Sequence, residues 1–180
     1  MVGGESDQER MELRNIQNLK RLRYIFEDIF ANAASYRAVF VLLSTPGNWE
    51  RVQLSDETPH ITDVIKTMTE TMGNTSTPTV LTVRTSMSDV NQEEGCVHDL
   101  DIPPNLLVLQ ALTDTRKMDG FADFYGSPQL HTKLKQLRAN DSILESIFKA
   151  NKQCEAKNGR PLFVQENGFT DFQLGEREVV

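Results

Sequence analysis

The 180-residue chain has one tryptophan and two cysteines, the residue type that cross-links small secreted proteins. Cys96 and Cys154 are too few for a disulfide framework. The first ten residues, MVGGESDQER, are polar and acidic, unlike a secretory signal or an Arg-rich transit peptide. The apolar runs are too short to span a bilayer. We therefore expect an intracellular protein, cytoplasmic or nuclear, that does not contact membranes.

Motifs that identify several common enzyme classes are missing as well. The sequence has no GxxxxGK[ST] phosphate loop, no GxGxxG after a strand, no GxSxG nucleophile elbow and no HExxH zinc motif. Its composition, 38% apolar and 25% charged, is nevertheless typical of a globular protein with a substantial core. We therefore assign no catalytic residue and expect no cofactor and no metal.

Positive charge is also scarce, since the formal net charge is −7. No lysine or arginine lies between Arg84 and Arg116, where the acidic residues are Asp89, Glu93, Glu94, Asp99, Asp101 and Asp114. Such a balance argues against a dedicated nucleic-acid binder. The basic segment 20–23 with Tyr24 is still suited to phosphate contact and base stacking. A nucleic-acid-associated regulator, or an inhibitor whose acidic stretch mimics nucleic acid, therefore remains an alternative.

Apolar patterning predicts several strands. The run from Tyr36 to Leu43 predicts a strand that is buried on both faces. Thr45-Pro46-Gly47-Asn48 has turn chemistry and predicts a hairpin whose second strand points Val52 and Leu54 inward. Residues 79–85 alternate and predict a strand with one polar face, whereas 105–113 predicts a second buried strand. Residues 121–125 and 160–165 predict two short strands.

Capping signals predict helices between these strands. A capping box at 6–9 predicts a helix that runs to about residue 33. Thr58-Pro59 has the composition of an N-cap and first helical residue, and Gly73-Asn74 of a stop. The apolar stripe between them consists of Ile61, Val64, Ile65, Met68 and Met72. Ser127-Pro128 predicts a further helical segment, in one piece or two, that continues through Ile143, Leu144, Ile147 and Phe148 to about residue 157.

The predicted order, αββαβββα, resembles the profilin-like and roadblock-like arrangements, in which helices flank a five-stranded antiparallel sheet. This is a resemblance of topology and implies no site residues. The predicted fold class is therefore α+β, with an antiparallel sheet of about five strands flanked by helices. We predict a disordered N-terminus over 1–5, a single α+β domain over 6–165 and a flexible polar tail over 166–180. Residues 6–18 of the first helix are polar and free to project from the domain.

Two clusters contain chemistry-bearing side chains. Cys96, His98, Asp99 and Asp101 lie within six residues, a composition suited to a metal or a Cys–His nucleophile. The spacing lacks the second ligand pair of a structural zinc site, and acidic neighbours raise the pKa of a thiol, so a solvated loop is the preferred interpretation. Asp56, His60 and Asp63 form the second cluster, which the start of a helix explains through its dipole. A small enzyme or metal-binding protein using the 96–101 loop remains an alternative.

The preferred hypothesis is a non-enzymatic protein–protein interaction module. It would act as an adaptor, dimerisation or regulatory subunit of a larger assembly, with protein partners that include a second copy of itself. The residues assigned to partner binding are Trp49, Arg51, Arg21, Arg23 and Tyr24. Trp49 and Arg51 share a face of the predicted hairpin, and exposed aromatic and arginine side chains are enriched at binding hot spots.

Overall fold

The computed structural model describes residues 15–87, 101–114, 142–155 and 163–173. Four strands and three α-helices are found in these ranges, together with one short 3-10 helix at Ala33–Ser35. In chain order the larger elements are α1 (Leu19–Ala31), β1 (Val39–Pro46), α2 (Ile61–Met72), β2 (Thr79–Met87), β3 (Leu106–Asp114), α4 (Ile143–Glu155) and β4 (Phe163–Gln165). The predicted strand at 121–125 and the helical segment beginning at Ser127 lie outside the described residues.

The described strands form one mixed sheet in the order β1-β2-β3-β4. β1 pairs with β2 and β2 with β3 in parallel, and only β4 runs antiparallel, against β3. The prediction of an antiparallel sheet was therefore wrong, although a mixed α/β architecture is present. The physical reason is the connection: α2 lies between β1 and β2, and a helical crossover brings the chain back to start the next strand in the same direction.

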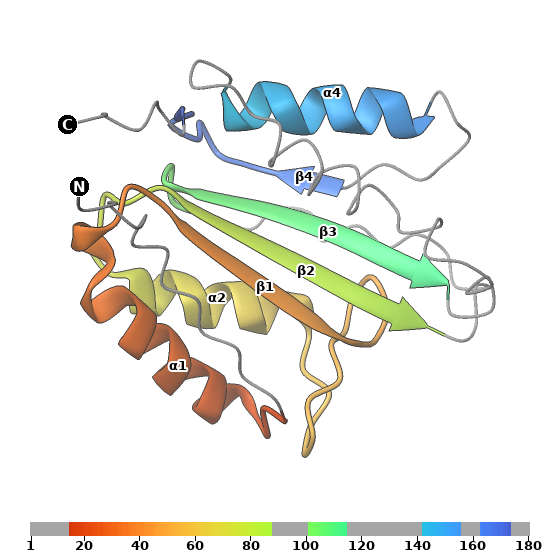
Figure 1. The fold of residues 1–180 in the computed structure, drawn as a ribbon. Coiled ribbons are helices and arrows are strands. Elements are labelled where there is room, and N and C mark those ends of the chain that lie inside the picture. The colour runs from red at the N-terminus through yellow and green to blue at the C-terminus, as the bar shows by residue number, and fades with distance from the viewer. Residues whose placement is uncertain (1–14, 88–100, 115–141, 156–162, 174–180) are drawn as a thin grey trace, which may run out of the picture.

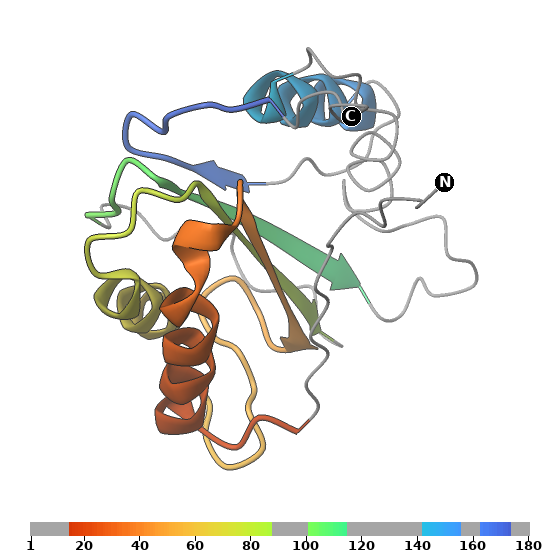
Figure 2. The same cartoon turned by 60° about the vertical axis from the view of Figure 1, so that its left-hand side comes forward.

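Helices cover both faces of this sheet (Figure 1). α1 and α2 pack on one face, where the core includes Phe26, Met68 and Leu81, each at most 1% exposed. α4 packs on the other face, where Ile143 and Ile147 meet Leu109 of β3. Figure 2 shows the same separation from a second direction, with α4 on one side of the sheet and α1 and α2 on the other. The layered arrangement is the usual solution for parallel strands, which are apolar on both faces.

α2 follows the predicted apolar stripe, because all five of its members are buried: Ile61, Val64, Ile65, Met68 and Met72. Its N-cap is His60 rather than the predicted Thr58, two residues later in the chain. A reciprocal capping box explains the shift, since the backbone N–H of His60 donates to Oδ2 of Asp63 at 3.3 Å. Gly73, with φ of 54°, ends the helix as predicted.

α1 begins later than predicted. Asn18 is its N-cap, and its side-chain oxygen accepts a hydrogen bond from the backbone N–H of Arg21 at 2.9 Å. Residues 15–18 are not helical, and Asn15 has a positive φ of 58°. The expected continuous helix from residue 6 was therefore wrong at this point, because a local asparagine cap starts α1 independently.

Two other predictions differ from the structure. The second strand of the hairpin is not formed: 51–54 makes only two isolated bridges, Val52 with Gly47 and Arg51 with His60, although Val52 and Leu54 are buried as predicted. Within the stretch predicted as a flexible tail, Phe169 is 6% exposed and contacts the ring of Phe172 at a centroid distance of 6.2 Å. Phe172 also receives the backbone hydrogen bond of Ile143, which fixes the start of α4.

Candidate interaction surface

The loop from Gly47 to His60 connects β1 to α2 and carries two of the predicted binding residues. Oδ1 of Asn48 accepts hydrogen bonds from the backbone N–H groups of Glu50 at 2.9 Å and Arg51 at 2.7 Å. The backbone N–H of Gly47 donates to the carbonyl of Ser86 at 3.0 Å, which ties the turn to β2. The loop therefore has a defined backbone, and its side chains project from fixed positions.

Trp49 and Arg51 differ in how accessible they are. Trp49 is half-buried, and its indole Nε1 is inaccessible to solvent with no hydrogen-bond partner among the described residues. Arg51 is exposed, and its Nη1 donates to the backbone carbonyl of Thr58 at 3.0 Å. An indole with a buried N–H contributes to packing, so Arg51 is the better placed of the two to meet a partner.

The basic residues of α1 lie along its outer surface. Arg21 is exposed, and half of the Tyr24 surface is accessible. Arg23 forms an ion pair with Glu70 of α2, in which both side chains are about two-fifths exposed. Such surface pairs contribute on the order of 0.2–1 kcal/mol, so Arg23 both links the two helices and remains partly available. Arg21, Arg23 and Tyr24 together form a basic and aromatic patch on α1.

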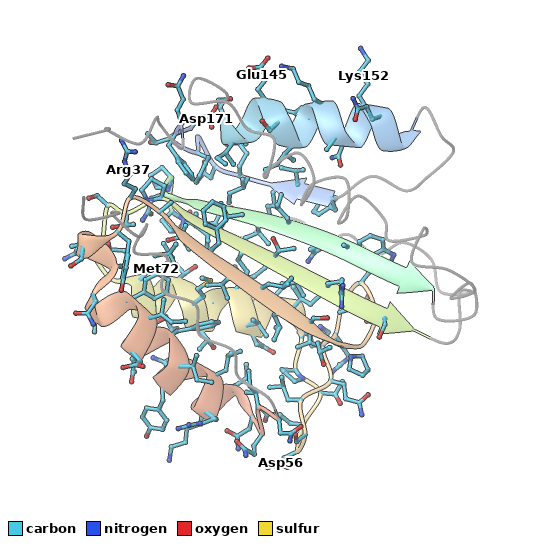
Figure 3. The ribbon with its side chains drawn as sticks, in the orientation of Figure 1. Arg37, Asp56, Met72, Glu145, Lys152 and Asp171 are labelled. Carbon is cyan, nitrogen blue, oxygen red and sulfur yellow. The ribbon has the colours of Figure 1, made fainter. Side chains whose placement is uncertain are left out.

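The loop and α1 touch directly, which brings the two sets of predicted residues onto neighbouring elements. The backbone N–H of Ser55 donates to the carbonyl of Ile16 at 3.0 Å, and that of Asp56 to the carbonyl of Gln17 at 2.9 Å. Oε1 of Glu57 accepts a hydrogen bond from the backbone N–H of Leu19. Figure 3 shows Asp56 at the far end of the loop, beside the start of α1. We call α1 together with this loop the α1–loop surface.

The carboxyl ends of the parallel strands are the place where open α/β sheets usually bind ligands. Here Pro46 of β1 lies beside Ser86 of β2 in the sheet register. Two residue pairs earlier, Nε of Arg84 donates to Oγ of Ser44 at 3.0 Å. Burial lowers the pKa of the Arg84 guanidinium, which nonetheless stays charged at neutral pH. The edge thus presents hydroxyl groups, a proline and a guanidinium.

The structure does not place the Cys96–Asp101 cluster, because all of it except Asp101 lies outside the described residues. In the second predicted cluster His60 and Asp63 do come together, as the cap of α2. Within the described ranges no three of the His, Cys, Asp and Glu side chains are grouped as metal ligands would be.

None of the described helices is long and apolar enough to cross a membrane.

Sequence reasoning missed an exposed apolar patch on β1. Phe40 is 48% exposed and Leu42 is 63% exposed, on the sheet face that carries α4. Phe40 contacts Phe172 at a ring-centroid distance of 6.3 Å, whereas Leu42 projects into solvent. The run of consecutive apolar residues predicted burial on both faces, whereas the order of the described strands places β1 at the edge of the sheet.

Neither a protein-family model nor a curated protein matches the chain. Solved structures do match, and among them is one described as the structure of pro-Sf-caspase-1. That match has a TM-score of 0.63 and 10% sequence identity, and it covers 91% of this chain and 74% of the other. The chain is therefore similar in fold to a procaspase. At this identity the similarity concerns the fold alone.

Proposed function

We propose that this chain is a non-enzymatic protein–protein interaction subunit built on a caspase-like fold. In this role it acts as an adaptor, dimerisation or regulatory subunit of a larger assembly. The observation that carries the proposal is the composition of the described sheet edge at the carboxyl ends of β1 and β2, the place where open α/β sheets usually bind ligands. Three further steps support it.

The first step concerns the groups available at the carboxyl ends of β1 and β2. Pro46 has no side chain that can transfer a proton, and the Ser86 hydroxyl is a weak nucleophile unless a base lies beside it. His60, the one histidine among the described residues, caps α2. Arg84 is held against Ser44 and is too basic to act as a proton acceptor. Among the described residues of β1 and β2, these side chains support a structural role for the edge.

The second step concerns the sequence motif of caspases. These enzymes carry the cysteine nucleophile in a Q-A-C-[RQG]-G motif, with a histidine about 50 residues upstream. In this chain Cys96 follows Glu94-Gly95, and Cys154 follows Lys152-Gln153. Neither cysteine lies in the motif, which supports the proposal of a non-enzymatic role on this fold.

The third step concerns the surface that remains for a partner. The α1–loop surface presents Tyr24, Arg21 and Arg51, a combination of aromatic and arginine side chains that is enriched at binding hot spots. Arg21 and Arg51 carry positive charge in a chain whose net charge is −7. A partner that presents carboxylates around an apolar contact would be complementary.

The test is affinity capture with the immobilised full-length chain, read by quantitative mass spectrometry at low and at moderate salt. We expect one or more stoichiometric protein partners that persist at moderate salt, because an aromatic contact is less sensitive to screening than a purely ionic one. Capture of nucleic acid that disappears with rising salt would favour the alternative regulator. Peptidase activity of the purified chain that Cys96→Ala abolishes would contradict the proposal.

A further inference from the structure

Among the described strands, β1 lies at one edge of the sheet. It is eight residues long, lies at the end of the strand order and pairs with β2 on one side. On its other side no described strand pairs with it. The loop closes this side at Pro46, whose carbonyl accepts a hydrogen bond from the backbone N–H of Gln53 at 2.8 Å. Within the part of the chain that the structure describes, the open part of this edge therefore runs from Phe40 to Ser44.

The backbone groups on this edge can be assigned from the ladder. The N–H of Val39 donates to Pro78 at 2.9 Å and that of Gly47 to Ser86 at 3.0 Å, so odd-numbered residues turn their backbone polar groups toward β2. Along a strand these directions alternate. The N–H and C=O groups of Phe40, Leu42 and Ser44 therefore point away from the sheet, toward any strand that would be added.

The side chains of the edge are unusual for an exposed strand. Native proteins protect such strands with charged residues, with proline or with a covering element. The sequence of β1, VFVLLSTP, contains no charged residue, and its proline is the last position, where the loop already closes the edge. Phe40 is about half exposed and Leu42 is 63% exposed beside these backbone groups. The strand has the features of a pairing site.

The edge is also self-complementary. In an antiparallel pairing of two β1 strands centred on Leu42, that residue lies opposite its own copy and Phe40 lies opposite Ser44. All three outward residues then fall at positions where opposite residues exchange both backbone hydrogen bonds. Opposite residues share a sheet face, so the two Leu42 side chains meet, and the uncharged strands approach without like-charge repulsion despite the net charge of −7. The symmetry is that of the commonest homodimers.

We propose that a second copy of this chain pairs with it through β1, antiparallel and with the two-fold axis at Leu42, to make one continuous sheet through both copies. This inference rests on the proposed function, because it specifies how a dimerisation subunit would associate with a second copy of itself. Capture of other proteins through the α1–loop surface does not depend on it, because Tyr24 and Arg21 lie on a different element.

Disulfide cross-linking tests the register. In a full-length background with Cys96→Ser and Cys154→Ser, we expect Leu42→Cys to form a covalent dimer under mild oxidation. Opposite residues of a hydrogen-bonded pair have Cα atoms about 5.5 Å apart, within the roughly 4.4–6.8 Å that a disulfide spans. Phe40→Cys is the matched control: its copy lies four residues along the strand, about 14 Å away, so no cross-link is expected. Equal cross-linking of both variants, or of neither, would overturn the proposal.

Sedimentation of the purified chain gives the second measurement. The unsubstituted protein should sediment as a dimer, and Leu42→Lys should shift it to monomer, since two lysines would lie directly opposite each other. Phe148→Lys, at a residue 55% exposed on α4, should leave the dimer intact. A monomeric unsubstituted chain would sink the inference while leaving the proposed capture of other proteins standing. So would a dimer that Leu42→Lys does not affect.

Discussion

Gln110 lies on β3 with 2% of its surface exposed, and neither atom of its side-chain amide has a hydrogen-bond partner among the described residues. A buried amide without partners costs free energy that an apolar side chain of similar size does not. We expect Gln110→Leu to raise the free energy of unfolding by about 1 kcal/mol or more, measured by urea denaturation. Gln53→Leu, at an exposed position, is the control and should change it little. A destabilised Gln110→Leu would show that the amide is satisfied after all.

Gly47 determines the path of the loop after β1. Its φ is 151°, and a Cβ placed on it would overlap the carbonyl oxygen of Arg51. We expect Gly47→Ala to lower the melting temperature by more than Gly73→Ala does, because Gly73 also has a positive φ but has open space where its Cβ would be. Thermal unfolding followed by circular dichroism compares the two variants. Equal losses would mean that backbone strain, and not the clash, sets the cost at Gly47.

At the scale of single elements, the start of α2 depends on the reciprocal cap between His60 and Asp63. Asp63→Ala removes the acceptor for the backbone N–H of His60 and should destabilise the protein by about 0.5–2 kcal/mol. Asp63→Asn keeps an acceptor at the same place and should retain most of the stability. Chemical denaturation of both variants checks this, and a loss in Asp63→Asn as large as that in Asp63→Ala would assign the effect to charge at the helix end instead.

The helices and strands themselves could be predicted well where apolar period and turn residues agree. The stripe of α2 and the inward pair Leu81 and Val83 of β2 are buried as the sequence predicts, and Gly73 ends α2. The cap at His60 was missed because Thr58-Pro59 is the stronger local signal. The helix begins after His60 because the side chain of Asp63, three residues later, accepts the backbone hydrogen bond of His60.

Strand direction was harder to predict. Turn residues at 45–48 do produce a turn, but the chain after it makes only isolated bridges before α2 begins. Near-continuous apolar runs, such as 106–109, were a signal for parallel strands covered on both faces. At β1 the same kind of run predicted burial on both faces, but this strand lies at the edge of the described sheet, where Phe40 and Leu42 are exposed. Local sequence determines which residues form a strand, whereas its neighbours are determined by the whole chain.

The predicted binding residues had a mixed outcome at this scale. The aromatic and basic pattern placed Tyr24 and Arg21 on an accessible helix surface, as expected from their polar neighbourhood. Trp49 is half-buried instead, because the turn at Gly47 and Asn48 folds the loop back toward the sheet. The assignment of Tyr24, Arg21 and Trp49 to partner binding remains a prediction. The contact between the loop and α1 could not be read from sequence, since it joins residues about 38 positions apart through backbone groups.

At the scale of the whole molecule, a sheet similar in fold to that of a procaspase has Pro46, Ser86 and Arg84 near the carboxyl ends of β1 and β2, and α1 presents aromatic and basic side chains. A shared fold does not determine the chemistry of a protein, because function depends on side chains placed on a scaffold that many sequences share. The account therefore predicts that interactions with other proteins, and not turnover of a substrate, depend on the exposed residues of α1 and its adjoining loop.

The most direct measurement compares two charge reversals in affinity capture from native extract, with binding quantified by mass spectrometry. Arg21→Glu lies on the α1–loop surface, and Lys152→Glu makes the same change of charge at an exposed position on α4. We predict that Arg21→Glu, alone or with Tyr24→Ala, reduces the amount of captured partner about tenfold or more, as expected for the loss of a hot spot, while Lys152→Glu retains it. Equal capture by all variants, or loss with Lys152→Glu alone, would contradict the account.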